Sequence, residues 1–255
     1  MRTVLAVGGS DSSGGAGIQA DLKALHAVGV HACTAVTAVT AQDSTGVRGS
    51  WPVPEEALRA QLRAVLDDLG ADVVKTGMLP SAASVTAVAE EVGDLPLVVD
   101  PVGVSSTGHE LTPPEALAAL REVLLPRALV VTPNLAEVAA LTGRPVRGAD
   151  DLEEAALAVL ALGPRWVLVT GGHLPGDPVD LLHDGTTAHL LPGRRVDTRH
   201  THGTGCTLAA ALAGHLALGA DVPTAARRAK DLVTAALERG YPLGAGAGPV
   251  GALPG

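Results

Sequence analysis

The architecture follows from TVLAVGGSDSSGGAGIQADLKAL, residues 3–25, where a strand-like run, a glycine-rich turn and a helix-like segment succeed one another directly. The opening apolar run shows no polar alternation, which is typical of a strand covered on both faces. Five glycines fall within residues 8–17, so the backbone there can approach a ligand closely. The segment predicts the first β-α unit of an open sheet, with a binding loop at the carboxyl end of the strand.

The same pattern recurs along the chain. Apolar runs alternate with helix-like segments, which predicts a doubly wound α/β fold with a mostly parallel sheet, in a single domain over 1–255. After Gly172 a small β-hairpin turning at Asp184-Gly185 is expected, followed by two Ala-rich helices. The expected strands are 3–7, 33–40, 72–76, 97–100, 128–132 and 166–170, and the expected helices are 17–28, 55–69, 81–92, 114–124, 135–141 and 151–162.

Composition excludes several classes of function. The net charge is −9 and no Lys/Arg cluster occurs, so nucleic acid is not an expected partner. The apolar stretch 207–220 is shorter than a bilayer span and contains His215, so we expect a buried helix and no membrane role. Cys33 and Cys206 form no spaced pair with other thiols or histidines. We therefore expect neither a disulfide nor a zinc site, and a reducing compartment, the cytoplasm.

THGTGC, residues 201–206, leads directly into the apolar helix. Gly203 and Gly205 permit a backbone nest that, together with the helix N-terminus, can hold a phosphoryl group. Cys206 lies where the helix dipole lowers the pKa of a thiol, which makes it a candidate acceptor for a substrate proton. The structural alternative is a small residue that packs at a helix start.

Carboxylates follow other expected strands. Asp100 ends one strand, and Asn134 and Glu137 lie one helical turn apart after another, so they can reach one hydrated cation, with Mg²⁺ the natural candidate. Asn-x-x-Glu is equally a helix start whose early acid complements the dipole. Both interpretations stay open.

Two further positions have a functional and a structural interpretation. Gln42 carries a donor and an acceptor on one planar amide, which suits an aminopyrimidine edge, but it also fits a surface turn. Asp21 on the first expected helix could simply face solvent. Seven histidines show no ligand spacing and are expected to be structural or exposed: His26, His31, His109, His183, His189, His200 and His215.

Taken together, these features favour phosphoryl transfer, in which positioning and charge stabilisation supply most of the catalysis. Neither a GxxxxGK[ST] P-loop nor the protein-kinase motif set is present, so those two kinase classes are excluded.

The chain resembles the thiamine-pathway hydroxymethylpyrimidine kinases of the ribokinase-like superfamily, from about residue 4 to residue 240. The wider superfamily usually has a catalytic Asp at the end of the glycine motif, and Cys206 resembles the variant of the thiamine branch, which also includes some pyridoxal kinases. The motifs that carry the resemblance are GGSDSSGGAGIQADLKAL, VTAQDSTGV, KTGMLP, VVDPV, TPNLAEVAALTG, GGHL and THGTGCTLAAAL.

The resemblance implies a homodimer that uses ATP and Mg²⁺ to convert 4-amino-5-hydroxymethyl-2-methylpyrimidine to its monophosphate and then its diphosphate. It also implies a set of site residues. They are Gly9, Asp21, Gln42, Met78 and Val104 for the pyrimidine; Gly203, Thr204, Gly205 and Cys206 for catalysis; Asp100 and Glu137 for Mg²⁺; and Asn134, Thr170, Gly172, Thr201 and Lys230 for the nucleotide.

The chain departs from this pattern at positions that concern phosphate. Relatives commonly have Met and Lys where this chain has Gly103 and Ser106, and Lys where it has Thr170. Each lost charge-assisted contact could cost about 1.5–3 kcal/mol, so slow catalysis or a single phosphoryl step is a hypothesis. The tail at 245–250 also lacks the histidines often found in relatives. Pyridoxal kinase and a non-catalytic pyrimidine sensor are the alternative functions.

Overall fold

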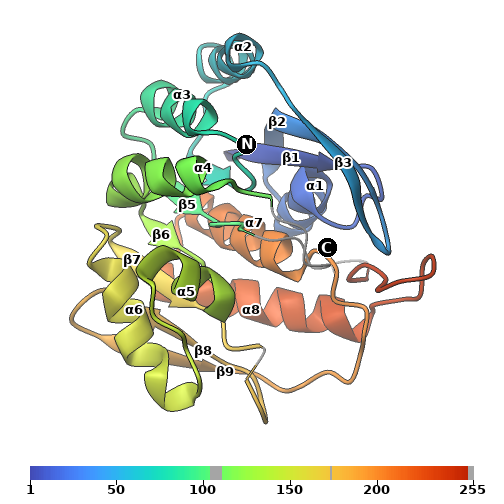
Figure 1. Cartoon of the computed structure of the whole chain (residues 1–255), viewed down its shortest axis with the longest axis vertical. Coiled ribbons are helices and arrows are strands. Elements are labelled where there is room, and N and C mark those ends of the chain that lie inside the picture. The colour runs from blue at the N-terminus through green and yellow to red at the C-terminus, as the bar shows by residue number, and fades with distance from the viewer. Residues whose placement is uncertain (104–110, 173, 252–255) are drawn as a thin grey trace.

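The computed structural model describes residues 1–103, 111–172 and 174–251. Nine strands form one sheet in the order β3-β2-β1-β4-β5-β6-β7-β8-β9 (Figure 1). Neighbouring strands from β2 through β1 to β7 pair in parallel. The antiparallel pairs are β2 with β3, β7 with β8, and β8 with β9. This confirms the predicted α/β class. The strands are β1 (Thr3–Asp11), β2 (His31–Asp43), β3 (Gly46–Pro52), β4 (Val73–Thr76), β5 (Leu97–Val99), β6 (Val130–Val131), β7 (Trp166–Val169), β8 (Val179–His183) and β9 (Ala188–Pro192).

The helices lie close to their expected positions, with one exception. α4 ends at Ala119, and the chain continues as a π turn (Leu120–Leu124) and a 3₁₀ turn (Leu125–Arg127). Pro126 explains the change, because a proline ring clashes with the carbonyl four residues earlier in a regular helix. The α-helices are α1 (Gly17–Val28), α2 (Glu55–Leu66), α3 (Ala82–Val92), α4 (Pro114–Ala119), α5 (Leu135–Thr142), α6 (Leu152–Leu160), α7 (Thr204–Ala217) and α8 (Val222–Glu238).

The edge strand β3 was not expected from the sequence. Its residues, GVRGSWP, include two glycines and a proline and show no apolar run. The tight turn after β2 explains its position, because the Asp43 carboxylate accepts hydrogen bonds from the amides of Thr45 (2.8 Å) and Gly46 (3.1 Å). Such an aspartate turn directs the chain back along the preceding strand. The predicted hairpin at Asp184-Gly185 is present as β8 and β9.

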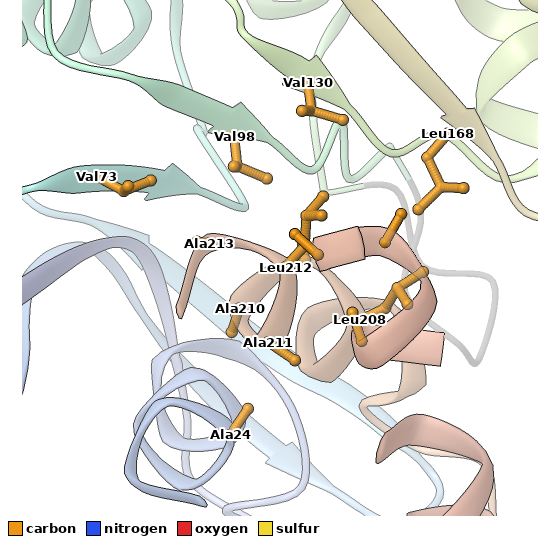
Figure 2. Packing of buried hydrophobic residues seen from close by; sticks show 14 of the residues in the cluster. Ala24, Val73, Val98, Val130, Leu168, Leu208, Ala210, Ala211, Leu212 and Ala213 are labelled. Atoms are coloured by element: carbon orange, nitrogen blue, oxygen red, sulfur yellow. The ribbon is translucent and has the colours of Figure 1, made fainter. Parts of the chain in front are cut away.

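Two apolar layers enclose the sheet. One joins the sheet to α1, α7 and α8, and the other joins it to α2, α3 and the turns that follow α4. Figure 2 shows Val73, Val98, Val130 and Leu168 projecting from neighbouring strands toward α7, with α1 beyond that helix. α7 is buried almost all round, as its Ala-rich sequence predicts. Among the described residues, no helix combines the length and apolarity needed to cross a membrane.

The strand order reverses direction beside β1. The chain moves from β1 outward to β2 and β3, then returns to place β4 on the other side of β1. Ligands of open α/β sheets bind outside the carboxyl ends of the strands at such a reversal. The fold therefore directs attention to the loop after β1 and to the residues that end β4 and β5.

Packing around α7 gives a stability prediction. Leu212 is fully buried between the sheet and α1, so we expect Leu212→Ala to lower the free energy of unfolding by about 2–5 kcal/mol. Leu218 at the end of the same helix is exposed, and Leu218→Ala should change it by less than about 1 kcal/mol. Urea unfolding monitored by circular dichroism measures both, and equal losses would contradict the packing described above.

Candidate active site

The Asp11 carboxylate organises the glycine-rich loop. Its oxygens accept hydrogen bonds from the amides of Ser13 (2.8 Å), Gly15 (3.1 Å) and Ala16 (2.7 Å). Burial raises the pKa of Asp11, but hydrogen bonds from His202, Ser13 and Ala16 outweigh burial and lower the pKa to about 2. The loop thus turns these amides onto its own carboxylate, which leaves the anion-binding role to another segment.

That segment is the start of α7. Gly203 has a φ of 85°, and a Cβ there would collide with the carbonyl oxygen of Gly15, so only glycine allows this close approach of the two loops. The Thr204 hydroxyl donates to the Thr201 carbonyl (2.6 Å) and closes the turn before the helix. α7 has no side-chain cap, and the first amides of a helix lack intrahelical acceptors. This turn, with Gly205 exposed on it, can therefore receive an anion.

A buried lysine lies at the centre of the candidate site. Nζ of Lys75 is 2.8 and 3.0 Å from the two carboxylate oxygens of Asp21, and 3.9 Å from Oδ2 of Asp100. Lys75 and Asp21 are fully buried, so the interpretation that Asp21 faces solvent is wrong. Burial lowers the pKa of Lys75, but the charges of Asp21, Cys206 and Asp100 outweigh it and raise the pKa above its ordinary value.

Cys206 belongs to the same cluster. Burial raises the pKa of its thiol to about 12; Asp100 and Asp21 raise it further, whereas Lys75 and the Gly17 amide oppose the shift. The expected thiolate is therefore wrong for this structure, because burial and two carboxylates outweigh the helix dipole. Cys206 is a protonated thiol at neutral pH, beside the turn that can receive an anion.

Asn134 and Glu137 form a capping box at the start of α5. The Asn134 side chain accepts hydrogen bonds from the amides of Ala136 (2.9 Å) and Glu137 (3.0 Å), and the Glu137 carboxylate accepts one from the Asn134 amide (2.8 Å). The helix-start interpretation is confirmed. The cation-binding interpretation is compatible with it, since a carboxylate has further lone pairs.

Asp100 and Glu137 are buried acids whose charges are balanced only in part, by Lys75 beside Asp100. Burial raises the pKa of Asp100 to about 6, with Lys75 opposing the shift, and burial together with Asp100 raises the pKa of Glu137 to about 8. Oδ2 of Asp100 has no hydrogen-bond partner among the described residues. A hard divalent cation fits this orphaned oxygen and would relieve the repulsion between the carboxylates.

The protein would supply only part of such a coordination shell. No group of three or more His, Cys, Asp and Glu side chains in the described parts of the chain could hold a metal ion. Mg²⁺ commonly binds to one or two carboxylates and completes its shell with water and phosphate oxygens. Thr76 and Thr132 end the strands on either side of Asp100, and their hydroxyls also lack partners within the described residues.

The predicted nucleotide residues fall into two groups. Asn134 and Thr170 form a parallel bridge, and the Thr170 amide donates to the carbonyl of Pro133 (3.0 Å), so this pair and Gly172 lie together at the ends of β6 and β7. Thr201 lies in the loop before α7. The structure therefore brings Asn134, Thr170 and Gly172 together and places Thr201 at the anion-binding turn.

Lys230 has a different environment from the one predicted. Its Nζ contacts Asp180 Oδ2 (2.9 Å) and the carbonyl oxygens of Leu191 (2.6 Å) and Pro178 (3.3 Å). An ammonium group has three protons, and these acceptors can use all of them. Lys230 joins α8 to β8 and β9, so this arrangement favours a supporting role and does not favour direct contact with a phosphate.

One of the predicted pyrimidine residues, Met78, lines a cavity beside β3, and Gly9 lies next to Met78. A Cβ at Gly9 would lie 3.0 Å from Sδ of Met78, so the two residues are adjacent. Met78 lines a cavity of about 410 Å³ together with Ser50, Pro52, Pro80, Leu111, Pro113 and Pro114. Val104 lies outside the described residues, as does Ser106. A second cavity of about 580 Å³ lies between 196–200 and the end of α8, and none of the predicted site residues lines it.

Known proteins resemble the chain over nearly its whole length. The phosphomethylpyrimidine kinase family model matches residues 11–251. The hydroxymethylpyrimidine/phosphomethylpyrimidine kinase of Streptomyces coelicolor is 59% identical over 249 residues, which are 97% of this chain and 93% of the relative. This chain belongs to the phosphomethylpyrimidine kinase family.

Two other relatives extend the comparison. The thiamine biosynthesis bifunctional protein of Geobacter sulfurreducens is 46% identical over 97% of this chain, and the match spans 51% of that longer protein. The crystal structure of an ADP complex of Bacillus subtilis pyridoxal kinase has 42% identity and a TM-score of 0.93, with 99% of this chain and 97% of that chain covered. The ribokinase-like fold expected from the sequence is confirmed.

Three charged or polar residues near the candidate site were not expected from the sequence. Lys75 had a visible signal, because it is the only charged residue within an otherwise apolar strand. His202 lies inside the glycine motif but shows no ligand spacing. Arg195 donates to the carbonyls of Gly172 (3.3 Å) and Leu174 (2.6 Å). It therefore places a cation near Thr170, where relatives commonly have lysine.

The buried acids give a pH-dependent prediction. The pKa of Glu137 in the folded state, about 8, exceeds its ordinary value of 4.5. The folded protein thus holds a proton that the unfolded chain releases, so stability falls as pH rises between these values. Glu137→Gln keeps an acceptor for the capping hydrogen bond and removes the loss of stability that deprotonation of Glu137 causes. We expect the variant to unfold at a higher temperature than the wild type at pH 8 without Mg²⁺, with a smaller difference at pH 5.

Thermal unfolding with and without MgCl₂ measures this effect. Mg²⁺ should stabilise the wild type at pH 8 and have little effect on Glu137→Gln. The exposed acid Glu115 in α4 provides the control, since Glu115→Gln should follow the wild type under all conditions. Parallel pH dependences for the wild type and Glu137→Gln would contradict the prediction.

Proposed function

We propose that this chain transfers the γ-phosphoryl group of ATP to the hydroxymethyl group of 4-amino-5-hydroxymethyl-2-methylpyrimidine, and then to the monophosphate, in thiamine biosynthesis. Family membership and the names of the relatives described above support this assignment. The structural observation that carries it is the cluster around Lys75. Lys75 forms ion pairs with Asp21 and Asp100, and Cys206 lies close enough to affect its pKa, so the predicted substrate, metal and catalytic residues lie near one another.

Each part of the site has a defined task in phosphoryl transfer. The amides at the start of α7 stabilise the negative charge that develops on the transferred group. Asp100 and Glu137 would hold Mg²⁺, which would neutralise phosphate charge when bound. Asn134, Thr170, Gly172 and Thr201 would contact the nucleotide. Gly9, Asp21, Gln42 and Met78 would surround the pyrimidine, with the Gln42 amide pairing with the aminopyrimidine edge.

The resting state of Cys206 constrains its role. A thiol with a pKa near 12 does not act as a free base at neutral pH. It can accept the substrate proton only after its own proton has left to solvent, which requires bound substrate and cations to lower its pKa, and Lys75 is the residue in place to do so. We propose that the Cys206 thiolate, once formed, accepts the proton of the substrate hydroxymethyl group, and that the charge of Lys75 stabilises this thiolate before transfer.

Substitution of Cys206 tests this role. We expect Cys206→Ala to lower kcat at least about tenfold with little change in the KM of the pyrimidine, because proton transfer affects the chemical step more than binding. Cys33→Ala removes the chain's other thiol, which is buried and far along the chain from α7, and should keep the kcat of the wild type. An unchanged kcat in Cys206→Ala would exclude the thiol from the reaction.

A coupled ATP-turnover assay tests the function itself. Hydroxymethylpyrimidine, its monophosphate and pyridoxal are presented separately, and the products are identified by mass spectrometry. We expect phosphorylation of both pyrimidines. Turnover of hydroxymethylpyrimidine without turnover of the monophosphate would restrict the function to one step, as the missing lysines at Ser106 and Thr170 suggest. Binding without any turnover would contradict the proposal.

Pyridoxal kinase is the second candidate. The observation in its favour is the likeness to the Bacillus subtilis pyridoxal kinase. Both substrates carry a hydroxymethyl group on a nitrogen heterocycle, so the same anion-binding turn serves either. The same assay separates them, since pyridoxal phosphate as the sole product would favour this candidate.

The proposal includes a single-domain, cytoplasmic homodimer. One continuous sheet supports the single domain, and two free cysteines suit a reducing compartment. Val39 and Trp51 face each other across β2 and β3 and are 51% and 59% exposed at the edge of the sheet. A second copy would cover them, and light scattering of the purified chain checks the mass.

A further inference from the structure

His202 lies where three segments of the site meet. Its Nε2 is 3.0 Å from Oδ2 of Asp11 in the glycine-rich loop and 3.3 Å from Nε2 of the Gln42 side chain at the end of β2. Its backbone pairs with the C-terminal tail through Gly248 and Val250. The side chain is only 8% exposed. Its hydrogen bonds are therefore constrained by protein groups and not by solvent.

Asp11 determines which atom of His202 carries hydrogen. The Asp11 carboxylate is ionised, because its pKa is about 2. An ionised carboxylate only accepts hydrogen bonds, so Nε2 of His202 must be protonated and must donate to it. The same N–H also faces Gln42, and an N–H can be shared only with an acceptor. The amide position of Gln42 nearest His202 must then hold the oxygen, which exchanges the oxygen and the nitrogen of this amide.

Thr40 leads to the same conclusion from the other side. The Thr40 hydroxyl donates to the carbonyl of Ser10 (2.9 Å) and lies 3.4 Å from Oε1 of Gln42. A hydroxyl has one proton, and Ser10 receives it. Thr40 therefore offers Gln42 only a lone pair, which suits the amide nitrogen. Since amide oxygen and nitrogen have nearly the same size, this network decides the orientation of the amide.

The backbone of Gln42 is fixed as well. The Ser12 hydroxyl donates to the Gln42 carbonyl (2.7 Å) and accepts from the Gln42 amide (2.8 Å). The pairing of β2 with β3 is irregular at this residue. Gln42 is thus tied to the glycine-rich loop at its backbone and held at its side chain by His202 and Thr40.

We propose that His202 and Thr40 are positioning residues that fix the Gln42 amide with its oxygen toward His202 and its nitrogen toward Thr40, and thereby set the substrate specificity of the site. In this orientation one lone pair on the oxygen and one N–H remain for a ligand. They complement a heterocycle edge on which an amino group adjoins an unprotonated ring nitrogen. An aminopyrimidine has this edge and pyridoxal does not, so the inference rests on the proposed function and deepens it.

Kinetics of His202→Leu test this inference. The variant replaces the imidazole ring with an apolar side chain of similar volume and thereby removes the N–H. We expect the KM of hydroxymethylpyrimidine to rise about tenfold with kcat changed less than about threefold, because the lost contact orients the substrate-binding group and does not act on the reacting atoms. The preference for the pyrimidine over pyridoxal should fall by a similar factor. Thr40→Val should shift both values in the same direction.

Two variants serve as controls. His200→Leu changes a neighbouring histidine whose Nδ1 accepts from the Gly248 amide (3.0 Å), so it perturbs the same loop and tail without contact to Gln42. It should leave the ratio between pyrimidine and pyridoxal unchanged. His202→Gln can present an N–H near the position of Nε2 and should recover part of the lost preference. Equal ratios in His202→Leu and His200→Leu would overturn the inference.

A double-mutant cycle tests whether His202 acts through Gln42. In a Gln42→Ala background, His202→Leu should have little further effect on the KM of the pyrimidine, since the positioned group is already absent. Full additivity would overturn the inference. Wild-type turnover of hydroxymethylpyrimidine is measured alongside, so failure of the proposed function is seen separately.

The wild-type protein provides a measurement that does not depend on the folding of any variant. Long-range ¹H–¹⁵N spectra of the histidine rings report which nitrogen carries hydrogen. At pH 8 we expect Nε2 of His202 to be protonated. An unprotonated Nε2 would overturn the inference whatever the kinetics show.

Discussion

The candidate site depends on one buried ammonium group. Lys75 lies within the sheet on β4, where hydration is lost and a lone charge would be costly. Asp21 of α1 forms a close ion pair with it, and Asp100 after β5 lies slightly farther away. Because the two carboxylates come from different elements, the lysine can be accommodated only when α1, β4 and β5 are assembled. The ion pairs thus couple correct folding to the formation of the site.

Two glycine-rich segments of similar composition have opposite tasks. The loop after β1 directs its amides onto Asp11 and becomes a rigid support. At the start of α7 the Thr204 amide donates to the Thr201 carbonyl, but no side chain caps the helix, so the amides that follow can bind an anion. The difference lies in one carboxylate. A glycine-rich stretch therefore indicates close backbone approach, while the surrounding side chains determine whether a phosphate can bind there.

The positive charges of the site are arranged differently from those expected for the family. Lysine is absent at positions 106 and 170, which are Ser106 and Thr170. Arg195, in the loop after β9, contacts the carbonyl of Gly172 instead. Its donors are engaged by carbonyl oxygens, so it supports the shape of the loop while adding positive charge nearby. Lys75 adds a second cation from within the sheet, on β4. Phosphate charge can thus be balanced in part by cations that lie behind the binding surface.

The order of apolar runs and helix-like segments was sufficient to predict the sheet, its helices and the hairpin of β8 and β9, because local periodicity and turn residues act over a few positions. The motifs also placed a turn before α7 and polar residues at the strand ends, while the roles of these residues stay predictions. The sequence did not reveal β3, because its residues form no apolar run and the turn at Asp43 was not recognised. It gave the wrong protonation state for Cys206, because Asp21, Asp100 and Lys75 surround the thiol only when distant segments meet. The partners of His202, Lys75 and Lys230 likewise come from residues far apart in the chain, and electrostatics and hydrogen bonding depend on distance in space, which sequence spacing does not provide.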